Sequence, residues 1–281
     1  MNDINRAIAL DRLARVMKYV VLIIGAFMVF FPFLWMLTTS LKTGAESIAI
    51  PPILFPETPQ WANYARAWEV VPWLLYFRNT LLVAVAGTAL TLLMTILAAY
   101  ALTIFAFPGK NVLFILFLAT MMVPSELLII QNYITVTKLG WLDTFRGIII
   151  PSLASGFYIF MLREYFMQVS SGLFKAAKVD GCSTWKYLWR IVVPVSKNAI
   201  STIAVLSFIS HWNAFVWPLM VTNTDEHRLL SIGLLRFTNS VSSDVALQMA
   251  GATIVLIPMV IFYIAFHKKI ISGVARSGLK G

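Results

Sequence analysis

The sequence is poor in charged residues, cysteine and histidine. Charged residues make up 12% of its 281 residues, and it holds one cysteine, Cys182, and three histidines. A soluble domain has about 25% charged residues. One cysteine forms no internal disulfide, and without a cluster of cysteine and histidine we expect no metal site.

The sequence also lacks the motifs of an enzyme. No stretch has the form G-x-x-x-x-G-K-[ST], so we expect no ATP hydrolysis by this chain alone. The histidines His211, His227 and His267 are scattered, and an intramembrane enzyme would need clustered acids, histidines or a nucleophile–base pair. We therefore expect no catalytic residues.

Apolar residues are abundant instead, at 59% of the chain. A helix that crosses a bilayer needs about 20 mostly apolar residues, and six segments qualify. They are about 19–41, 80–107, 111–137, 147–167, 196–222 and 245–267. The first is too long for the apolar region of a cleaved signal peptide. The sequence predicts an all-α polytopic membrane protein of six transmembrane helices, with residues 1–281 as one domain.

The positive charge predicts the orientation of these helices. The net charge is +10, and it lies in short clusters between apolar segments, which is untypical of a nucleic-acid-binding face. If the N-terminus is cytoplasmic, 15 of the 22 lysines and arginines fall on that side and 7 on the other. Because cytoplasmic loops carry the excess of positive charge, we expect both termini in the cytoplasm and no nucleic-acid partner.

Residues 171–190 form the most informative loop on the cytoplasmic side. Gly181 is typical of a left-handed residue at a helix end, and Ser183 or Thr184 can cap a second helix. We expect Phe174 and Ala177 to share one helix face; in the second helix, the residues expected on one face are Trp185, Leu188 and Trp189. This short helix, turn and helix either enters a cleft of another protein or only anchors the loop at the membrane surface.

The same loop resembles the EAA motif of ABC importer permeases. Ala176, Ala177, Gly181, Ile191 and Pro194 have the spacing of that motif, with Val193 in the usual leucine place. Lys175 stands where the family usually has glutamate. The resemblance implies a type I ABC importer permease fold, in which this loop is the coupling helix that sits in a cleft of the ATPase subunit. The residues it assigns to coupling are Lys175, Ala176, Ala177, Asp180, Gly181, Trp185 and Pro194.

Further segments resemble the carbohydrate branch of that family, the maltose-type and arabinose-oligosaccharide-type second permeases. They are Phe31–Lys42, Ala99–Leu102, Phe107–Lys110, Met121–Glu126, Trp212–Leu219 and Gly278–Gly281. The family usually has an arginine near Ile104, and this chain does not.

The likeness implies a sugar permease in the bacterial inner membrane. Its expected partners are a homologous second permease, two ATPase subunits, an extracytoplasmic solute-binding protein, the sugar and membrane lipid. ATP and Mg would bind to the ATPase, and no cofactor to this chain. The alternative is an ABC permease for another solute, such as a glycerol-phosphate-like polyol, an amino acid or a peptide. A carrier that works without an ATPase would need charged residues at the midplane, where only Glu126 is a candidate.

Polar residues within the predicted spans are candidates for the pathway. Pro124 predicts a kink, after which Glu126 and Asn132 either line a path or lie at the outer membrane boundary. In the fifth span, the expectation is that Ser207, Ser210 and His211 share a face, with Asn213 following. That face either lines the pathway or hydrogen-bonds to a neighbouring helix.

Overall fold

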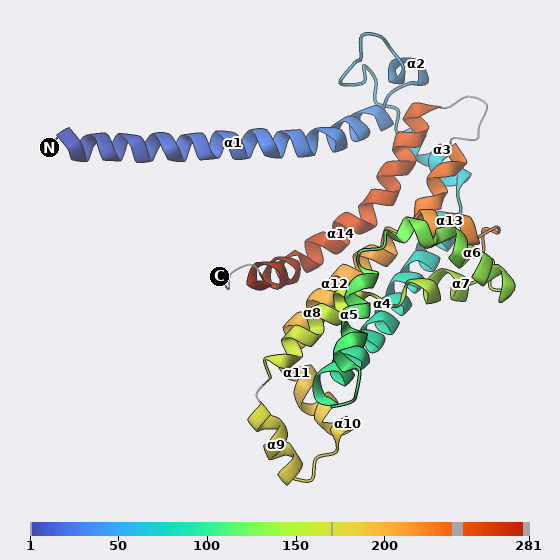
Figure 1. Ribbon diagram of the computed structural model, residues 1–281. Helices are drawn as coiled ribbons and strands as arrows, with labels where there is room; N and C mark the ends of the chain where they lie inside the picture. Colours follow the sequence, from blue (N-terminus) through green and yellow to red (C-terminus); the bar gives the residue numbers. More distant parts are fainter. Residues whose placement is uncertain (1, 170, 238–243, 278–281) are drawn as a thin grey trace. The chain divides into compact units, whose positions relative to one another are not determined.

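Every regular element is a helix in the part of the chain that the computed structural model describes, residues 2–169, 171–237 and 244–277 (Figure 1). The all-α prediction is confirmed. Three helices are long, namely α1 (Asn2–Ser40), α4 (Trp73–Ile104) and α14 (Val245–Ser277). The C-terminal motif Gly278–Gly281 lies outside the described residues.

The remaining elements are short. The α-helices are α2 (Gly44–Ser47), α3 (Ala62–Val70), α5 (Lys110–Thr120), α6 (Ile129–Lys138), α7 (Phe145–Ile149), α8 (Gly156–Met167), α9 (Ser171–Val179), α10 (Thr184–Tyr187), α11 (Val193–Val195), α12 (Lys197–Trp212) and α13 (Val216–Val221). Tighter or wider turns form η1 (Ser125–Leu128), η2 (Ile150–Ser152), η3 (Leu188–Val192) and η4 (Leu230–Phe237).

The long helices match three of the predicted spans. Apolar stretches long enough to cross a bilayer are Asp11–Ser40, Trp73–Ile104 and Val245–His267. They correspond to the predicted segments 19–41, 80–107 and 245–267. In α1 the side chains from position 11 to 33 are all exposed, as expected of a helix whose surroundings are apolar rather than aqueous.

The other three predicted spans are not continuous helices. Within 111–137, the axes of α5 and of the segment Ser125–Lys138 meet at 94°. The break precedes Pro124, which has φ −57° and ψ 130° and cannot continue the helix of α5. The predicted kink is confirmed here, although it is sharper than a kink within one span.

The two later predicted spans are also divided. Within 147–167, the segment Phe145–Ser152 is bent by 52° from α8. The segment 196–222 contains α12 and α13, with a break after Asn213. A count of apolar residues gives the length of a segment but not its changes of direction, which follow from prolines and from contacts with other helices.

Two compact units emerge from the internal contacts. The first comprises Met1–Val71 and Leu234–Pro258. In it the end of α1 is tied to α3, because the Asn63 side chain donates to the backbone carbonyls of Ser40 and Lys42, each at 2.9 Å. The buried Lys42 ammonium lies 4.2 Å from the centre of the Trp35 ring and donates to Thr39 at 3.1 Å.

The second unit, Pro72–Gly233 with Met259–Gly281, holds the features that matter for function. Its centre is α4, which packs against α12 and α8, while α5 packs on α8 (Figure 1). A buried cluster that includes Ile96, Leu162 and Ile203 joins these helices. Burial of such large aliphatic side chains contributes about 1.5–3 kcal/mol each where the alternative is water.

A polar contact closes this unit at the other end of α4. Asp143 accepts hydrogen bonds from the backbone amides of Asn223 and Thr224 and from the Thr224 hydroxyl, at 3.0, 3.2 and 2.7 Å. Burial raises the pKa of Asp143, but these hydrogen bonds and the nearby His227 outweigh it and hold the pKa below its usual range. The loop before α7 is therefore fastened to the loop after α13.

Candidate functional site

The loop at residues 171–190 folds into two helices joined by a tight turn, as predicted. Gly181 has φ +71°, in the left-handed region, and its amide donates to the carbonyl of Lys178 at 3.1 Å. The Ser183 hydroxyl caps α10 by accepting from the amide of Lys186 at 3.3 Å. These local interactions define the hairpin of α9 and α10 (171–192, with η3 included), which we call the cytoplasmic hairpin after the side of the membrane that the sequence predicts for it.

One side of the cytoplasmic hairpin is buried against the rest of the unit. Ala177, Tyr187 and Leu188 are buried there, and Phe174 packs against Tyr187 with ring centres 5.0 Å apart. The predicted common face of Phe174 and Ala177 is confirmed, because both belong to this cluster.

The opposite side of α9 is exposed. It carries Lys175, Ala176 and Val179, the last 88% exposed, and the exposed Asp180 follows the end of the helix. This side of α9 is therefore accessible to another protein.

Leu188 lies differently from the sequence-based prediction. Leu188 is fully buried, whereas Trp185 is 61% exposed and packs edge-on against Trp189 at 5.7 Å. The predicted common face is therefore confirmed for Trp185 and Trp189 and wrong for Leu188. A π-helical turn begins at Leu188, so the usual spacing of 3.6 residues does not hold here. Pro194, in α11, is exposed.

Tyr100 connects this hairpin to α4. Its hydroxyl donates to the backbone carbonyl of Thr184 at 2.7 Å, although the two residues are 84 positions apart. Tyr100 is 4% exposed and belongs to the same buried cluster as Leu188. A displacement of α10 therefore acts directly on the C-terminal end of α4.

The resemblance to ABC importer permeases predicts that Tyr100→Phe reduces the solute transported per ATP hydrolysed in the assembled transporter. The ring keeps its packing, but the Thr184 carbonyl loses its donor, at a cost of about 1 kcal/mol. The measurement is uptake and ATPase activity on the same proteoliposomes. Thr103→Val is the matched control, because the Thr103 hydroxyl bonds only within α4, to the carbonyl of Ala99. If Tyr100→Phe left the ratio of solute transported to ATP hydrolysed unchanged, the Tyr100–Thr184 hydrogen bond would have no part in coupling the hairpin to α4.

A cavity of about 880 Å³ lies elsewhere in the same unit, and we call it the polar cavity because polar side chains of the predicted spans reach its mostly apolar wall. Its walls come from the break between α5 and α6, the η2–α8 segment, the end of α12 and the start of α13. Four of the predicted pathway residues line it, namely Glu126, Asn132, Ser210 and His211.

Ser207 and Asn213 are not in this lining. Ser207 is 1% exposed, and its hydroxyl has no hydrogen-bond partner among the described residues. Asn213 is exposed after the end of α12. The predicted common face is correct for Ser207 and His211, which are both buried, whereas Ser210 is exposed at the cavity. Of the two alternatives for this face, a contact with a neighbouring helix is observed for His211, which meets Thr91 of α4, while lining of the pathway stays a prediction.

His211 joins the cavity to the contact between α12 and α4. Its Nε2 lies 3.4 Å from the Thr91 hydroxyl, and the ring sits against Gly87. A Cβ atom on Gly87 would lie 2.8 Å from Nε2, so only glycine fits at this close approach.

The sequence-based prediction missed several lining residues. Ser152, Ser155, Phe157 and Phe215 reach the cavity from breaks between helices, as does Trp217, whose indole donates to the carbonyl of Gly147 at 3.1 Å. Pro151 and Pro218, close to these breaks, were the available signal. Over the ranges that the structure describes, no group of three or more histidine, cysteine, aspartate or glutamate side chains is placed to hold a metal.

Comparison with known proteins places these features in a family. The family model described as binding-protein-dependent transport system inner membrane component matches residues 92–276. The arabinooligosaccharides transport system permease protein of Bacillus subtilis is 29% identical, over 89% of this chain and 90% of the relative. The lactose transport system permease protein of Rhizobium radiobacter is 30% identical, over 95% and 97%. The sn-glycerol-3-phosphate transport system permease protein of Yersinia pestis is 28% identical, over 92% and 95%.

Solved structures have the same fold. A bacterial ABC transporter that imports the acidic polysaccharide alginate contains a chain with a TM-score of 0.81 and 25% identity, over 92% of this chain and 96% of that one. A chain from the complex of an alginate ABC transporter with its periplasmic protein has a TM-score of 0.64 at 15% identity, and it supports the fold alone. The ABC importer permease fold is thereby confirmed. With two thirds of its length matched by the family model, the chain belongs to the inner membrane components of binding-protein-dependent ABC transport systems.

Proposed function

We propose that this chain is a permease subunit of an ATP-driven importer for a neutral sugar or oligosaccharide. Two of the relatives described above are named for an oligosaccharide and a disaccharide, and one for a glycerol phosphate. The chemistry of the polar cavity distinguishes between these solutes.

The composition of the cavity wall is the observation that carries the proposal. Among aliphatic residues, the wall contains hydroxyl and amide side chains (Ser125, Ser152, Ser155, Ser210, Asn132) and aromatic ones (Phe157, Phe215, Trp217). Sugars combine hydroxyl groups with apolar ring faces, and such a wall offers partners for both.

The charge of the wall disfavours an anionic solute. Among the described residues that line the cavity there is no lysine or arginine, and Glu126 is its one carboxylate. A phosphate group would meet repulsion from Glu126 and find no lysine or arginine of the described lining to pair with. A neutral sugar is therefore the better fit than sn-glycerol 3-phosphate or an acidic polysaccharide.

The wider assembly follows from the family. A homologous second permease would complete the pathway, two ATPase subunits would bind ATP and Mg, and an extracytoplasmic binding protein would deliver the sugar. The chain would cross the inner membrane as one domain of six spans, with 15 of 22 positive side chains and both termini in the cytoplasm. Glu126, Asn132, Ser207, Ser210, His211 and Asn213 remain the proposed pathway residues.

The cytoplasmic hairpin would transmit the ATPase cycle. We assign to this contact Lys175, Ala176, Ala177, Asp180, Gly181, Trp185 and Pro194. All but Ala177 are exposed, so Ala177 would support the hairpin from inside. ATP binding would favour one pre-existing arrangement of the permease by binding it more tightly, and the change would reach the cavity through Tyr100, α4 and His211.

The first test is purification of the tagged chain from its native membrane, followed by uptake measurements on the isolated assembly. We expect a second permease and an ATPase to accompany it, and ATP-dependent uptake of a neutral sugar but not of sn-glycerol 3-phosphate. Ser210→Trp should block this uptake by filling the cavity, whereas Ser201→Trp, on the same helix but outside the cavity, should not. Uptake of the phosphate ester alone would establish the alternative solute class. Transport by the chain without an ATPase would overturn the whole assignment.

A further inference from the structure

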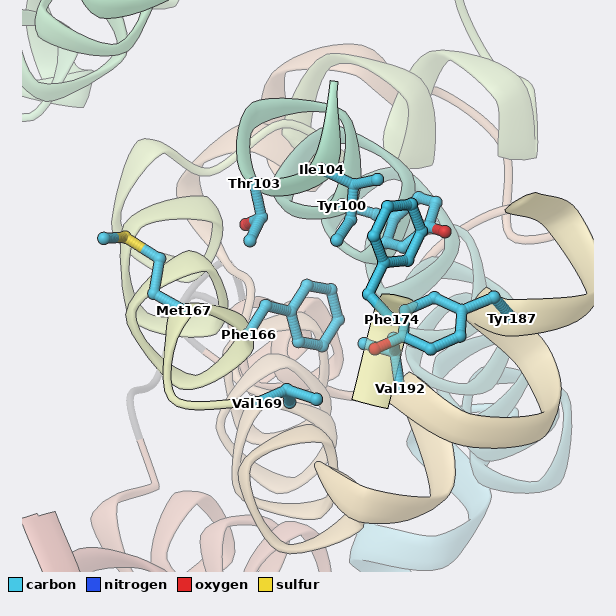
Figure 2. A pocket seen from close by; sticks show the side chains of 9 residues that line it. All are labelled: Tyr100, Thr103, Ile104, Phe166, Met167, Val169, Phe174, Tyr187 and Val192. Carbon is cyan, nitrogen blue, oxygen red and sulfur yellow. The ribbon is translucent and has the colours of Figure 1, made fainter. Parts of the chain in front are cut away.

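A second cavity, of about 320 Å³, lies behind the cytoplasmic hairpin. Its wall consists of Tyr100, Thr103, Ile104, Phe166, Met167, Val169, Phe174, Tyr187 and Val192 (Figure 2). These residues come from the ends of α4 and α8 and from the hairpin itself. The wall is mostly aromatic and aliphatic, so the cavity suits an apolar body.

The Tyr187 hydroxyl is a polar group in this otherwise mostly apolar wall. Tyr187 is 2% exposed and lines the cavity. Figure 2 shows this hydroxyl between Phe166 and Val192, facing the open space, whereas the Tyr100 hydroxyl points away toward Thr184. A phenolic hydroxyl can donate a hydrogen bond, so a ligand atom in the cavity has a donor within reach.

Positive charge lies next to this apolar wall. The Lys110 ammonium donates to the backbone carbonyls of Thr103 and Phe105, each at 3.0 Å, which leaves its third proton free. The Lys178 ammonium lies 5.3 Å from the centre of the Phe174 ring. Thus Lys110 contacts the wall residue Thr103 on α4, and Lys178 contacts the wall residue Phe174 on α9.

A third cation increases the positive potential at this end of the unit. The charge of Arg163 acts on Lys110, and its guanidinium lies 4.0 Å from the centre of the Phe114 ring. Glu164 pairs with Arg163 at 2.9 Å, which leaves two lysines without a recorded carboxylate partner in the described chain. An anion held here would relieve the repulsion among these cations.

We propose that this cavity binds an anionic acyl amphiphile, with its carboxylate or phosphate group toward Lys110 and Lys178 and its hydrocarbon chain in the cavity. The transported sugar fits poorly, because the wall offers few free polar groups for its hydroxyls. Basic pockets beside apolar helices on the cytoplasmic side are the recognised places for acidic lipid headgroups. The ligand would hold the cytoplasmic hairpin against α4 and α8, so the membrane's content of acidic lipid would tune coupling whatever sugar is transported.

Photo-crosslinking in nanodiscs tests the proposal on the assembled transporter. One arm uses palmitic acid with a diazirine on its chain, and the other uses phosphatidylglycerol with the same group on one acyl chain. Labelled peptides are then identified by mass spectrometry. We expect labelling within 100–104, 166–169 and 187–192. Labelling by the fatty acid alone or by the phospholipid alone identifies the source, and either one supports the site.

Matched variants separate this site from general contact with lipid. Ile104→Trp fills the cavity and should remove this labelling, while Val112→Trp adds the same ring at a 62% exposed position of α5 and should leave it intact. Lys110→Gln should weaken labelling about fivefold, as expected for one cation at a charged membrane surface. Lys197→Gln, an exposed lysine at the start of α12, should not.

Two results would overturn the proposal. One is labelling of lipid-exposed helices without any labelling of the cavity peptides. The other is full cavity labelling in a well-folded Ile104→Trp protein. Tyr187→Phe, which keeps the packing and removes only the hydroxyl, covers the case in which Ile104→Trp does not fold. Cavity labelling unchanged in both Tyr187→Phe and Lys110→Gln would count against the site equally.

Discussion

Replacing Gly181 by proline is expected to abolish transport while the chain still inserts in the membrane. Gly181 has φ +71°, and proline is restricted to about −65°, so the turn between α9 and α10 cannot form. The substitution also removes the amide that donates to Lys178 at 3.1 Å. The hairpin would then present its exposed side in a different orientation, and ATP hydrolysis in the assembly would no longer drive uptake.

Two milder substitutions serve as controls for Gly181→Pro. A Cβ atom at this position would meet open space, so the obstacle is the backbone conformation and not crowding. Asparagine tolerates the left-handed region, and Gly181→Asn should keep most of the transport activity. Gly181→Ala should fall between the two, at a cost of about 1–2 kcal/mol. Uptake, ATPase activity and membrane insertion are measured together. Normal uptake in Gly181→Pro would remove the hairpin from the coupling mechanism.

Gly87→Ala should strongly destabilise the contact between α4 and α12 and impair transport. The new methyl group would lie 2.8 Å from His211 Nε2, closer than two non-bonded atoms can remain. Overpacking of a tight contact costs about 1–3 kcal/mol. Thermal unfolding of the purified protein in detergent should therefore move to lower temperature. Transport should fall as well, because His211 also lines the polar cavity.

A second substitution decides whether the His211 contact is the cause. His211→Ala removes the ring that the new methyl would meet, so the double variant should be more stable than the sum of the two single losses predicts. Gly25→Ala is the control for the change of residue type, because nothing lies within 4 Å of a Cβ atom there. Additive losses in the double variant would place the effect of Gly87→Ala elsewhere.

Local signals in the sequence predicted local structure well. The left-handed turn at Gly181 and the cap at Ser183 follow from preferences of single residues, and both are confirmed. Pro124 correctly indicated a break. Leu188 was misplaced because a π-helical turn alters the spacing, and no residue type announces such a turn.

The lining of the polar cavity was only partly predictable, because it depends on how the helices bend and not on local sequence signals alone. Glu126, Asn132, Ser210 and His211 were found because polar residues in an apolar segment stand out. Residues such as Phe157 and Phe215 were missed, since an aromatic residue in an apolar segment looks like any packing residue until the bends between helices are known.

By itself, the sequence determined that the chain is helical, apolar and organised in spans, because composition and short-range spacing control helix formation and membrane preference. The tertiary structure alone decided which distant residues meet. Tyr100 bonds to Thr184 and His211 lies on Gly87 only after α4 packs against the hairpin and α12. These contacts depend on the rotation and bend of whole helices, and such quantities arise from the sum of many packing contacts and not from any local pattern.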